Sequence, residues 1–241
     1  MTDPPKGSAE KNGSDGAGGR PNGLNIILFG PPGVGKGAQA QLLSYNHDII
    51  HLSTGDVIRD EIARGTTLGQ RVREAVGRGE FADDETVLGI VMSRVDLPEY
   101  QNGFVMDGFP RTIRQAELFG ELLSDRGRKV SHAFFITAPE ATILQRLGGR
   151  RICSKCGRTY HKEFRRPKIH GICDYCKSKV VRRHDDDPET HRERLRTYNE
   201  KTLPLAEYYR KTGSLVEIDG NESIEQVHDS IEKVIAARKE A

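Results

Sequence analysis

The stretch LNIILFGPPGVGKGAQAQLL, residues 24–43, contains the features that decide the fold. Its first part, Leu24–Gly30, is a short apolar run that ends in glycine, which is typical of a strand buried on both faces of a parallel sheet. The run is followed by the spacing Gly-x-x-x-x-Gly-Lys, which ends at Lys36, and by a helical pattern over Lys36–Tyr45. A strand, a glycine-rich loop and a helix in this order predict a loop that binds phosphate with backbone N–H groups, the helix N-terminus and the lysine.

The rest of the chain alternates between strand and helix patterns. Strand-like segments are found at Asn102–Asp107, His132–Thr137 and Gly213–Asp219, with helical patterns between them. Strands that alternate with helices predict an α/β fold with a parallel sheet. Near the C-terminus, an amphipathic helix is expected with Ile224, Val227, Ile231 and Val234 or Ile235 on its inner face.

Composition excludes several classes of protein. The chain has 241 residues, of which 35% are hydrophobic and 30% are charged, as in a globular protein with one main core and a small insertion. Apolar runs are only strand-length, so we expect no membrane span. Residues 1–23 contain almost no large apolar side chain and predict a flexible tail. No secretory or transit signal is evident in this tail, and cytoplasmic residence is the expectation.

Four cysteines lie in a basic insertion that begins near Arg151 and ends near Asp186. They form two Cys-x-x-Cys pairs separated by 16 residues, which is close to the spacing of structural zinc sites: Cys153, Cys156, Cys173 and Cys176. Disulfides are the alternative, but they are not favoured in a reducing compartment. From Arg146 to Arg183 there are 13 Lys or Arg residues against two acids, so an anionic ligand is expected here.

Polar residues near the ends of the predicted strands suggest phosphate chemistry. Asp107 ends the segment NGFVMD, where a carboxylate can hold Mg2+ beside a phosphate loop, and Arg111 follows as a second phosphate clamp. A helix that starts at Pro139 and Glu140 is expected to carry Arg146 and Arg150 on one face. Arg183 and Arg194 add two more guanidinium groups able to bind phosphate oxygens. No ligand or nucleophile constellation is evident around His47, His51 or His170.

Several motifs in one order resemble the adenylate kinase family, in its long-lid type. They are GPPGVGKGAQA, LSTGDVIRDEI, NGFVMDGFPRT, RTIRQAE, GRRICSKCGRTYH and DDDPETHRERL, and the resemblance extends from Leu24 to the C-terminus. It implies the P-loop nucleoside monophosphate kinase fold over residues 24–241, with a helical AMP-binding insertion at 53–82 and a zinc-bearing lid at 149–186. It also implies a monomer that transfers a phosphoryl group reversibly from ATP, with Mg2+, to AMP, giving two ADP.

The resemblance also implies roles for individual residues. The residues expected to bind ATP are Gly33, Val34, Gly35, Lys36, Gly37, Ala38, Arg146, Arg150, Thr159 and Tyr160. The residues expected to bind AMP are Thr54, Arg59, Glu80, Phe81, Ala82, Gly108, Phe109, Pro110, Arg111, Gln115, Arg183 and Arg194. The residues expected to act in catalysis are Lys36, Asp107, Arg111, Arg146, Arg150, Arg183 and Arg194. Asp185 and Asp186 match residues at the hinge of the lid.

One position departs from the family pattern. The family has Gly after the lysine and commonly Thr or Ser next, whereas this chain has Gly37 and then Ala38. The backbone N–H of Ala38 can still contact phosphate, and the metal can be held by nucleotide oxygens, Asp107 and water. Retained activity with an altered metal or phosphate contact is therefore expected.

Three alternatives are open at this point. A pyrimidine monophosphate kinase is the nearest, but that group typically has Ala at the position of Thr54 and lacks a cysteine-bearing long lid. A kinase that prefers GTP as donor is harder to separate, because backbone and lid contacts largely hold the donor base. A zinc-ribbon nucleic-acid binder would explain the basic insertion but not Asp107, Arg111 and Thr54, so we expect nucleotides and not nucleic acid as ligands.

Overall fold

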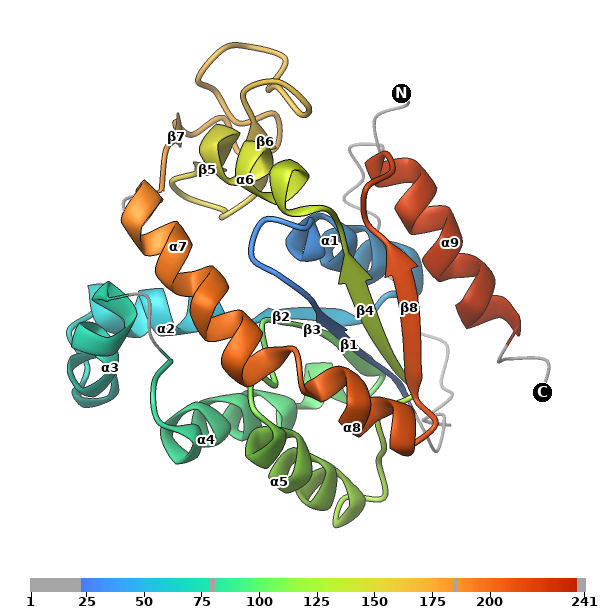
Figure 1. Cartoon of the computed structure of the whole chain (residues 1–241). Coiled ribbons are helices and arrows are strands. Elements are labelled where there is room, and N and C mark those ends of the chain that lie inside the picture. Colours follow the sequence, from blue (N-terminus) through green and yellow to red (C-terminus); the bar gives the residue numbers. More distant parts are fainter. Residues whose placement is uncertain (1–22, 79–80, 184–185, 238–241) are drawn as a thin grey trace, which may run out of the picture.

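The computed structural model describes residues 23–78, 81–183 and 186–237. Nearly all of the predicted flexible tail, residues 1–22, and the predicted AMP contact Glu80 lie outside the described residues. The main sheet has the order β2-β3-β1-β4-β8, and all its paired strands are parallel. Its strands are β1 (Leu24–Phe29), β2 (Ile50–Ser53), β3 (Gly103–Asp107), β4 (His132–Thr137) and β8 (Leu215–Asp219) (Figure 1).

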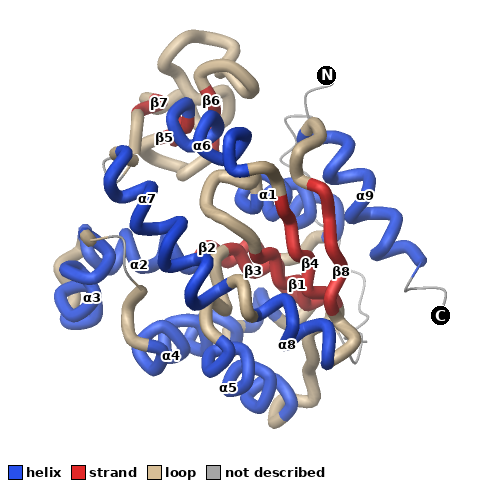
Figure 2. Tube along the Cα trace, in the orientation of Figure 1, coloured by secondary structure: helices blue, strands red, loops and turns tan. Residues whose placement is uncertain are grey.

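Helices cover both faces of this sheet. One face packs against α1 (Lys36–His47) and α9 (Ile224–Ala237), and the other against α4 (Asp84–Val95), α5 (Ile113–Ser124) and α8 (Leu205–Lys211) (Figures 1 and 2). Ile26 and Leu28 of β1 point to the first face, and Ile27 and Phe29 point to the second, with all four nearly inaccessible to solvent. The apolar run in β1 is thus explained by its place in the middle of a three-layer molecule.

Two smaller units interrupt the alternation of strands and helices. The first contains α2 (Thr54–Ala63) and α3 (Thr67–Gly77), which follow β2 directly. The second is a small antiparallel sheet with the order β6-β5-β7, whose strands are β5 (Arg150–Cys153), β6 (Thr159–His161) and β7 (Val180–Val181). The chain enters this sheet from α6 (Glu140–Gly149) and leaves it into α7 (Pro188–Thr197), at the top of the view in Figure 1.

Most expected elements are present, with small shifts at their ends. The fourth expected strand, Gly213–Asp219, is shorter and begins at Leu215, and the inner face of α9 is completed by Ile235, since this residue is more buried than its neighbour Val234. Strand β2 was not expected from the sequence. It has only four residues, two of them polar, so it carries too little apolar pattern to signal a strand.

One local expectation was wrong. Arg150 lies after α6 with extended backbone and begins β5, so it does not share a helix face with Arg146. After the insertion, α7 continues into a π-helical turn at Tyr198–Thr202, and α8 begins at Leu205, directly after Pro204. A short 3-10 helix spans Pro98–Tyr100. Across the described ranges, no helix has both the length and the apolar character needed to span a bilayer.

Candidate functional site

The ends of three neighbouring strands meet at one edge of the main sheet. Ser53 of β2 and Leu28 of β1 are both aligned with Asp107 of β3. Carboxyl ends of parallel strands face the same edge, so the loops that follow β1, β2 and β3 lie together. The phosphate loop, the start of α2 and the DGFPRT segment are therefore brought to a single place, although they are far apart in the sequence.

The loop after β1 has the geometry expected for binding phosphate. Gly35 precedes the first turn of α1 with a φ of 112°, and Gly33 has a φ of 86°, both in the region that favours glycine. The Nζ atom of Lys36 donates to the carbonyl oxygens of Gly30 and Pro31, each at 2.9 Å. Burial lowers the pKa of Lys36 to about 8, although the carboxylate of Asp107 acts in the opposite direction. The lysine is thus held over the loop as a partly desolvated cation.

Asp107 is surrounded by positive groups. Burial alone would raise its pKa, but the nearby imidazole of His51 and the charges of Lys36 and Arg111 hold the pKa below its ordinary value. The Nε2 atom of His51 lies 3.8 Å from Asp107 Oδ2. Asp107 is therefore a carboxylate at neutral pH. His51 had no functional assignment from the sequence, because only the pairing of β2 with β3 brings it to this carboxylate.

Arg111 is positioned by the backbone and side chains around it. Its Nε atom donates to the carbonyl oxygen of Gly108 at 2.7 Å, and its backbone N–H donates to Gln115 Oε1 at 2.7 Å. Burial lowers the pKa of Arg111 to about 10, with Asp107 acting against this and Arg194, Arg59 and Arg183 adding to it. The cations expected around the phosphates are thus close enough to repel one another, and an anionic ligand would relieve that repulsion.

The expected acceptor residues form a connected wall. The hydroxyl of Thr54 donates to the carbonyl oxygen of Gly108 at 2.8 Å, and the guanidinium of Arg111 lies 5.0 Å from the centre of the Phe81 ring. Ala82, Phe109 and Pro110 are buried beside them. Gln115 is 1% exposed, and its amide nitrogen donates to Asp84 at 2.8 Å, so it ties the DGFPRT segment to α4. Arg59 pairs with Asp56 on α2.

Asp186 pairs with two of the predicted arginines. The Nε atom of Arg150 donates to Asp186 Oδ2 at 2.7 Å, and Arg194 Nη1 lies 3.5 Å from Asp186 Oδ1. His191 Nε2 lies 3.3 Å from the same oxygen. The carboxylate is almost fully buried, and the guanidinium of Arg150 keeps its pKa low against the effect of burial. Asp186 thus joins the start of the small sheet to α7.

The guanidinium of Arg146 donates to backbone carbonyl oxygens. Its Nη1 atom donates to the carbonyl oxygens of Val34 at 3.1 Å and Gly220 at 2.6 Å, so it links α6 to the phosphate loop and to the turn after β8. The predicted side chains therefore fall into two groups. Lys36, Asp107, Arg111 and Thr54 meet at the sheet edge, whereas Arg146, Arg150 and Arg194 border it from α6, β5 and α7.

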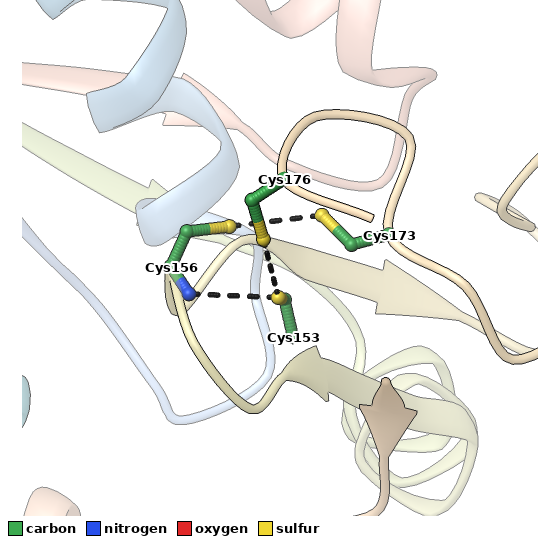
Figure 3. A group of neighbouring side chains, drawn as sticks. All are labelled: Cys153, Cys156, Cys173 and Cys176. Carbon is green, nitrogen blue, oxygen red and sulfur yellow. Dashed lines mark hydrogen bonds between the residues drawn. The ribbon is translucent and has the colours of Figure 1, made fainter. Parts of the chain in front are cut away.

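The four cysteines form a compact cluster in the small sheet and in the loops that connect its strands. Their sulfur atoms all lie within 4.8 Å of one another and point inward, as Figure 3 shows. No disulfide joins them, and the pairs Cys153–Cys176 and Cys156–Cys173 have Sγ separations of 3.3 and 3.6 Å. A tetrahedral zinc ion with Zn–S bonds of about 2.3 Å needs sulfurs about 3.8 Å apart, which fits this cluster.

Tyr160 and Thr159 are neighbours on β6 but face opposite sides. The Oη atom of Tyr160 donates to Cys173 Sγ at 3.3 Å and accepts from the backbone N–H of Asp174 at 2.8 Å, so this ring packs against the cysteine cluster. Side chains alternate along a strand, and Thr159 therefore faces away from the cysteines, towards Gly37 of the phosphate loop. The predicted ATP contact of Tyr160 stays a prediction, because its hydroxyl is engaged with the lid.

Known proteins match this chain over most of its length. The family model for adenylate kinase matches residues 28–214. The adenylate kinase of Clostridium tetani is 43% identical over 214 residues, which cover 89% of this chain and 99% of that protein. Adenylate kinases of Clostridium novyi and Archaeoglobus fulgidus are 41% and 42% identical, over 90% and 88% of this chain and 100% and 98% of their own lengths. The chain therefore belongs to the adenylate kinase family and is a nucleoside monophosphate kinase, a phosphotransferase.

Proposed function

We propose that the enzyme transfers the γ-phosphoryl group of ATP to AMP, with Mg2+, and that the reaction gives two ADP. The observation that carries this proposal is the meeting of Lys36, Asp107 and Arg111 at one sheet edge, with Thr54 beside them. Transfer between phosphates needs little covalent chemistry from the protein and depends on position and on charge stabilisation. An acceptor phosphate is already an anion, so no general base is needed.

The two nucleotides would bind on opposite sides of this edge. The donor triphosphate would lie on the loop Gly33–Ala38, with Lys36 and Arg146 beside it. The acceptor would lie against Thr54, Arg59, Arg111 and the wall that contains Phe81 and Ala82. The Mg2+ that accompanies ATP would neutralise part of the phosphate charge, and Asp107 is the carboxylate placed to hold it.

The small sheet at 149–186 would act as a lid over the donor, and α2–α3, at 53–82, as the AMP-binding unit. Water competes with AMP as an acceptor, and a lid that covers the phosphates would exclude it and bring Arg150 and Arg194 to the site. The pairing of both arginines with Asp186 supports this role, because one carboxylate then orients two guanidinium groups on either side of the lid. The cysteine cluster would hold zinc as a structural ion that keeps the lid folded.

The test is an ADP-formation assay with ATP and Mg2+ in which AMP, CMP, UMP and GMP are offered separately. We expect a strong preference for AMP, since Thr54 lies where pyrimidine-specific relatives typically have Ala. Turnover of CMP or UMP would show instead that the acceptor is a pyrimidine monophosphate. Replacing ATP by GTP in the same assay measures the donor preference. The expectations of a monomer and of cytoplasmic residence stay predictions, and sedimentation at working concentration would test the first.

A further inference from the structure

Neither of the positions where phosphate loops carry a hydroxyl has one in this chain. In the common form of the loop, a Ser or Thr directly after the lysine contacts Mg2+. Here that position is Gly37, and the following residue, where relatives commonly place Thr or Ser, is the buried Ala38. The loop itself therefore has Lys36 but no side-chain hydroxyl with which to contact the metal or the terminal phosphates.

The space that such a side chain would enter is bordered by two polar atoms. A Cβ atom placed at Gly37 would lie 3.1 Å from Asp107 Oδ2 and 4.0 Å from Thr159 Oγ1. A hydroxyl of the loop would thus stand between the carboxylate of Asp107 and the lid. The lid brings its own hydroxyl to this same place.

The direction of Thr159 follows from its strand. Thr159 is paired with Ile152 of β5, and the next residue, Tyr160, points to the cysteine cluster. Strand alternation then turns Thr159 to the opposite side, towards the loop. The strand thus fixes the side of the small sheet on which Thr159 lies, and its Oγ1 is the Thr159 atom nearest to a Cβ placed at Gly37.

We propose that the Thr159 hydroxyl supplies from the lid the contact to the metal–triphosphate group that Gly37 and Ala38 do not supply from the loop. This inference rests on the proposed function and deepens it, because it makes one donor contact depend on the position of the lid. A kinase with the hydroxyl on its loop would hold the metal–nucleotide before the lid arrives. In this chain the contact is complete only with the lid in place.

The experiment measures binding of the β,γ-imido analogue of ATP by calorimetry, using zinc-loaded full-length protein. Titrations are done with Mg2+ and in Mg2+-free buffer without chelator, so that the zinc stays bound. We expect Thr159→Val to weaken binding about three- to tenfold with Mg2+ and less than about twofold without it, as for the loss of one hydrogen bond. Thr159→Ser, which keeps a hydroxyl, should restore most of the affinity.

Ala38→Thr provides the decisive background, because it returns a hydroxyl to the loop. In that background, Thr159→Val should weaken binding of the analogue by less than about twofold with Mg2+. The effects of the two substitutions on affinity should therefore be strongly non-additive. The exposed Thr212, which follows α8, gives a matched control as Thr212→Val, with no effect expected. Zinc content and melting temperature of each variant show whether the lid is intact.

Three results would overturn the inference. They are unchanged Mg2+-dependent binding in Thr159→Val, an equal loss with and without Mg2+, and an equal loss in the wild-type and Ala38→Thr backgrounds. If the wild type transfers phosphate from ATP to AMP while any of these is found, the inference fails and the proposed function stands. If the wild type neither binds the analogue nor phosphorylates AMP, both fail.

Discussion

Lys36 should make donor binding depend on pH in the range where its own charge changes. Burial lowers its pKa to about 8, and a bound triphosphate favours the charged form, so binding at pH 8 should take up about half a proton per site. Affinity should be fully present below this pKa and should fall by about tenfold per pH unit well above it. Calorimetry in buffers of different ionisation enthalpy measures the uptake.

The control for this prediction is Lys36→Arg, which keeps its charge over the whole range and should take up no proton at this position. Binding to the wild type at pH 8 without proton uptake would contradict the assignment of Lys36 as a partly desolvated phosphate ligand.

At the scale of residues, the sequence predicted those site features whose residues lie at fixed, short spacings. The phosphate loop and the cysteine pairs each have their partners within a few positions, so the spacing alone carries the chemistry. His51 and Asp84 could not be found this way, because their contacts depend on strand pairing and on packing between α4 and α5. The contacts of Asp186 could not be predicted from local spacing either. The family resemblance identified the residue, but only the fold shows that it pairs with Arg150, Arg194 and His191.

Asp186 should be the residue on which attachment of the lid depends most. Asp186→Ala leaves Arg150 and Arg194 without their shared carboxylate, and loss of one partner of a buried pair costs about 3 kcal/mol or more. The low folded-state pKa of Asp186 means that its contribution is present above about pH 4, the unfolded value, and is lost as pH falls through the folded value. Urea unfolding at about pH 7 and about pH 3.5 should show that the difference in stability between variant and wild type shrinks at the lower pH.

For the same variant, turnover should fall roughly 10- to 100-fold, because the two arginines are no longer oriented. Arg210→Ala removes an exposed pair with Glu207 and Glu217 instead, and should leave the stability of the protein nearly unchanged, because water screens such pairs. Equal effects of the two substitutions would argue against a special role for Asp186.

Metal removal should make the small sheet unfold at a lower temperature than the rest of the molecule. The sheet buries few apolar side chains besides Tyr160 and the cysteines, so it depends on the metal for its own stability. Chelator-treated protein should show an early melting step and raised hydrogen exchange over β5–β7, while the main sheet melts as before. Purified protein without stoichiometric zinc, and without earlier melting after chelation, would contradict the metal site.

At the scale of elements, β1 and α9 were predictable because their apolar patterns match their burial on the sheet. The π-helical turn at Tyr198–Thr202 was not, since nothing in its composition marks an extra residue in a helix. This turn places the hydroxyl of Thr202 3.0 Å from the carbonyl oxygen of Arg111, so it supports the site from the far side. Irregular helix turns often occur beside functional sites, for reasons that lie in tertiary contacts.

The whole molecule should respond to its two nucleotides in separate regions. With the ATP analogue and Mg2+, hydrogen exchange should slow over the start of α1 and over β5–β6. With AMP alone, it should slow over α2 and α3, because α2 carries Thr54 and Arg59 and α3 packs against α2. Exchange measured by mass spectrometry with each nucleotide and with both tests this division. Protection of α2 and α3 by the donor analogue alone would contradict the assignment of the two binding units.

The opposite directions of Thr159 and Tyr160 constrain how the lid sequence can vary between species. A single inserted residue between Cys156 and Thr159 would reverse the alternation of β6, turning the hydroxyl towards the sulfurs and the aromatic ring towards the loop. The segment from 163 to 171 is under no such restriction, since it contains no cysteine and no β-strand. Over evolutionary time, length changes in this lid should therefore accumulate in that segment, while the short turn before β6 keeps its number of residues.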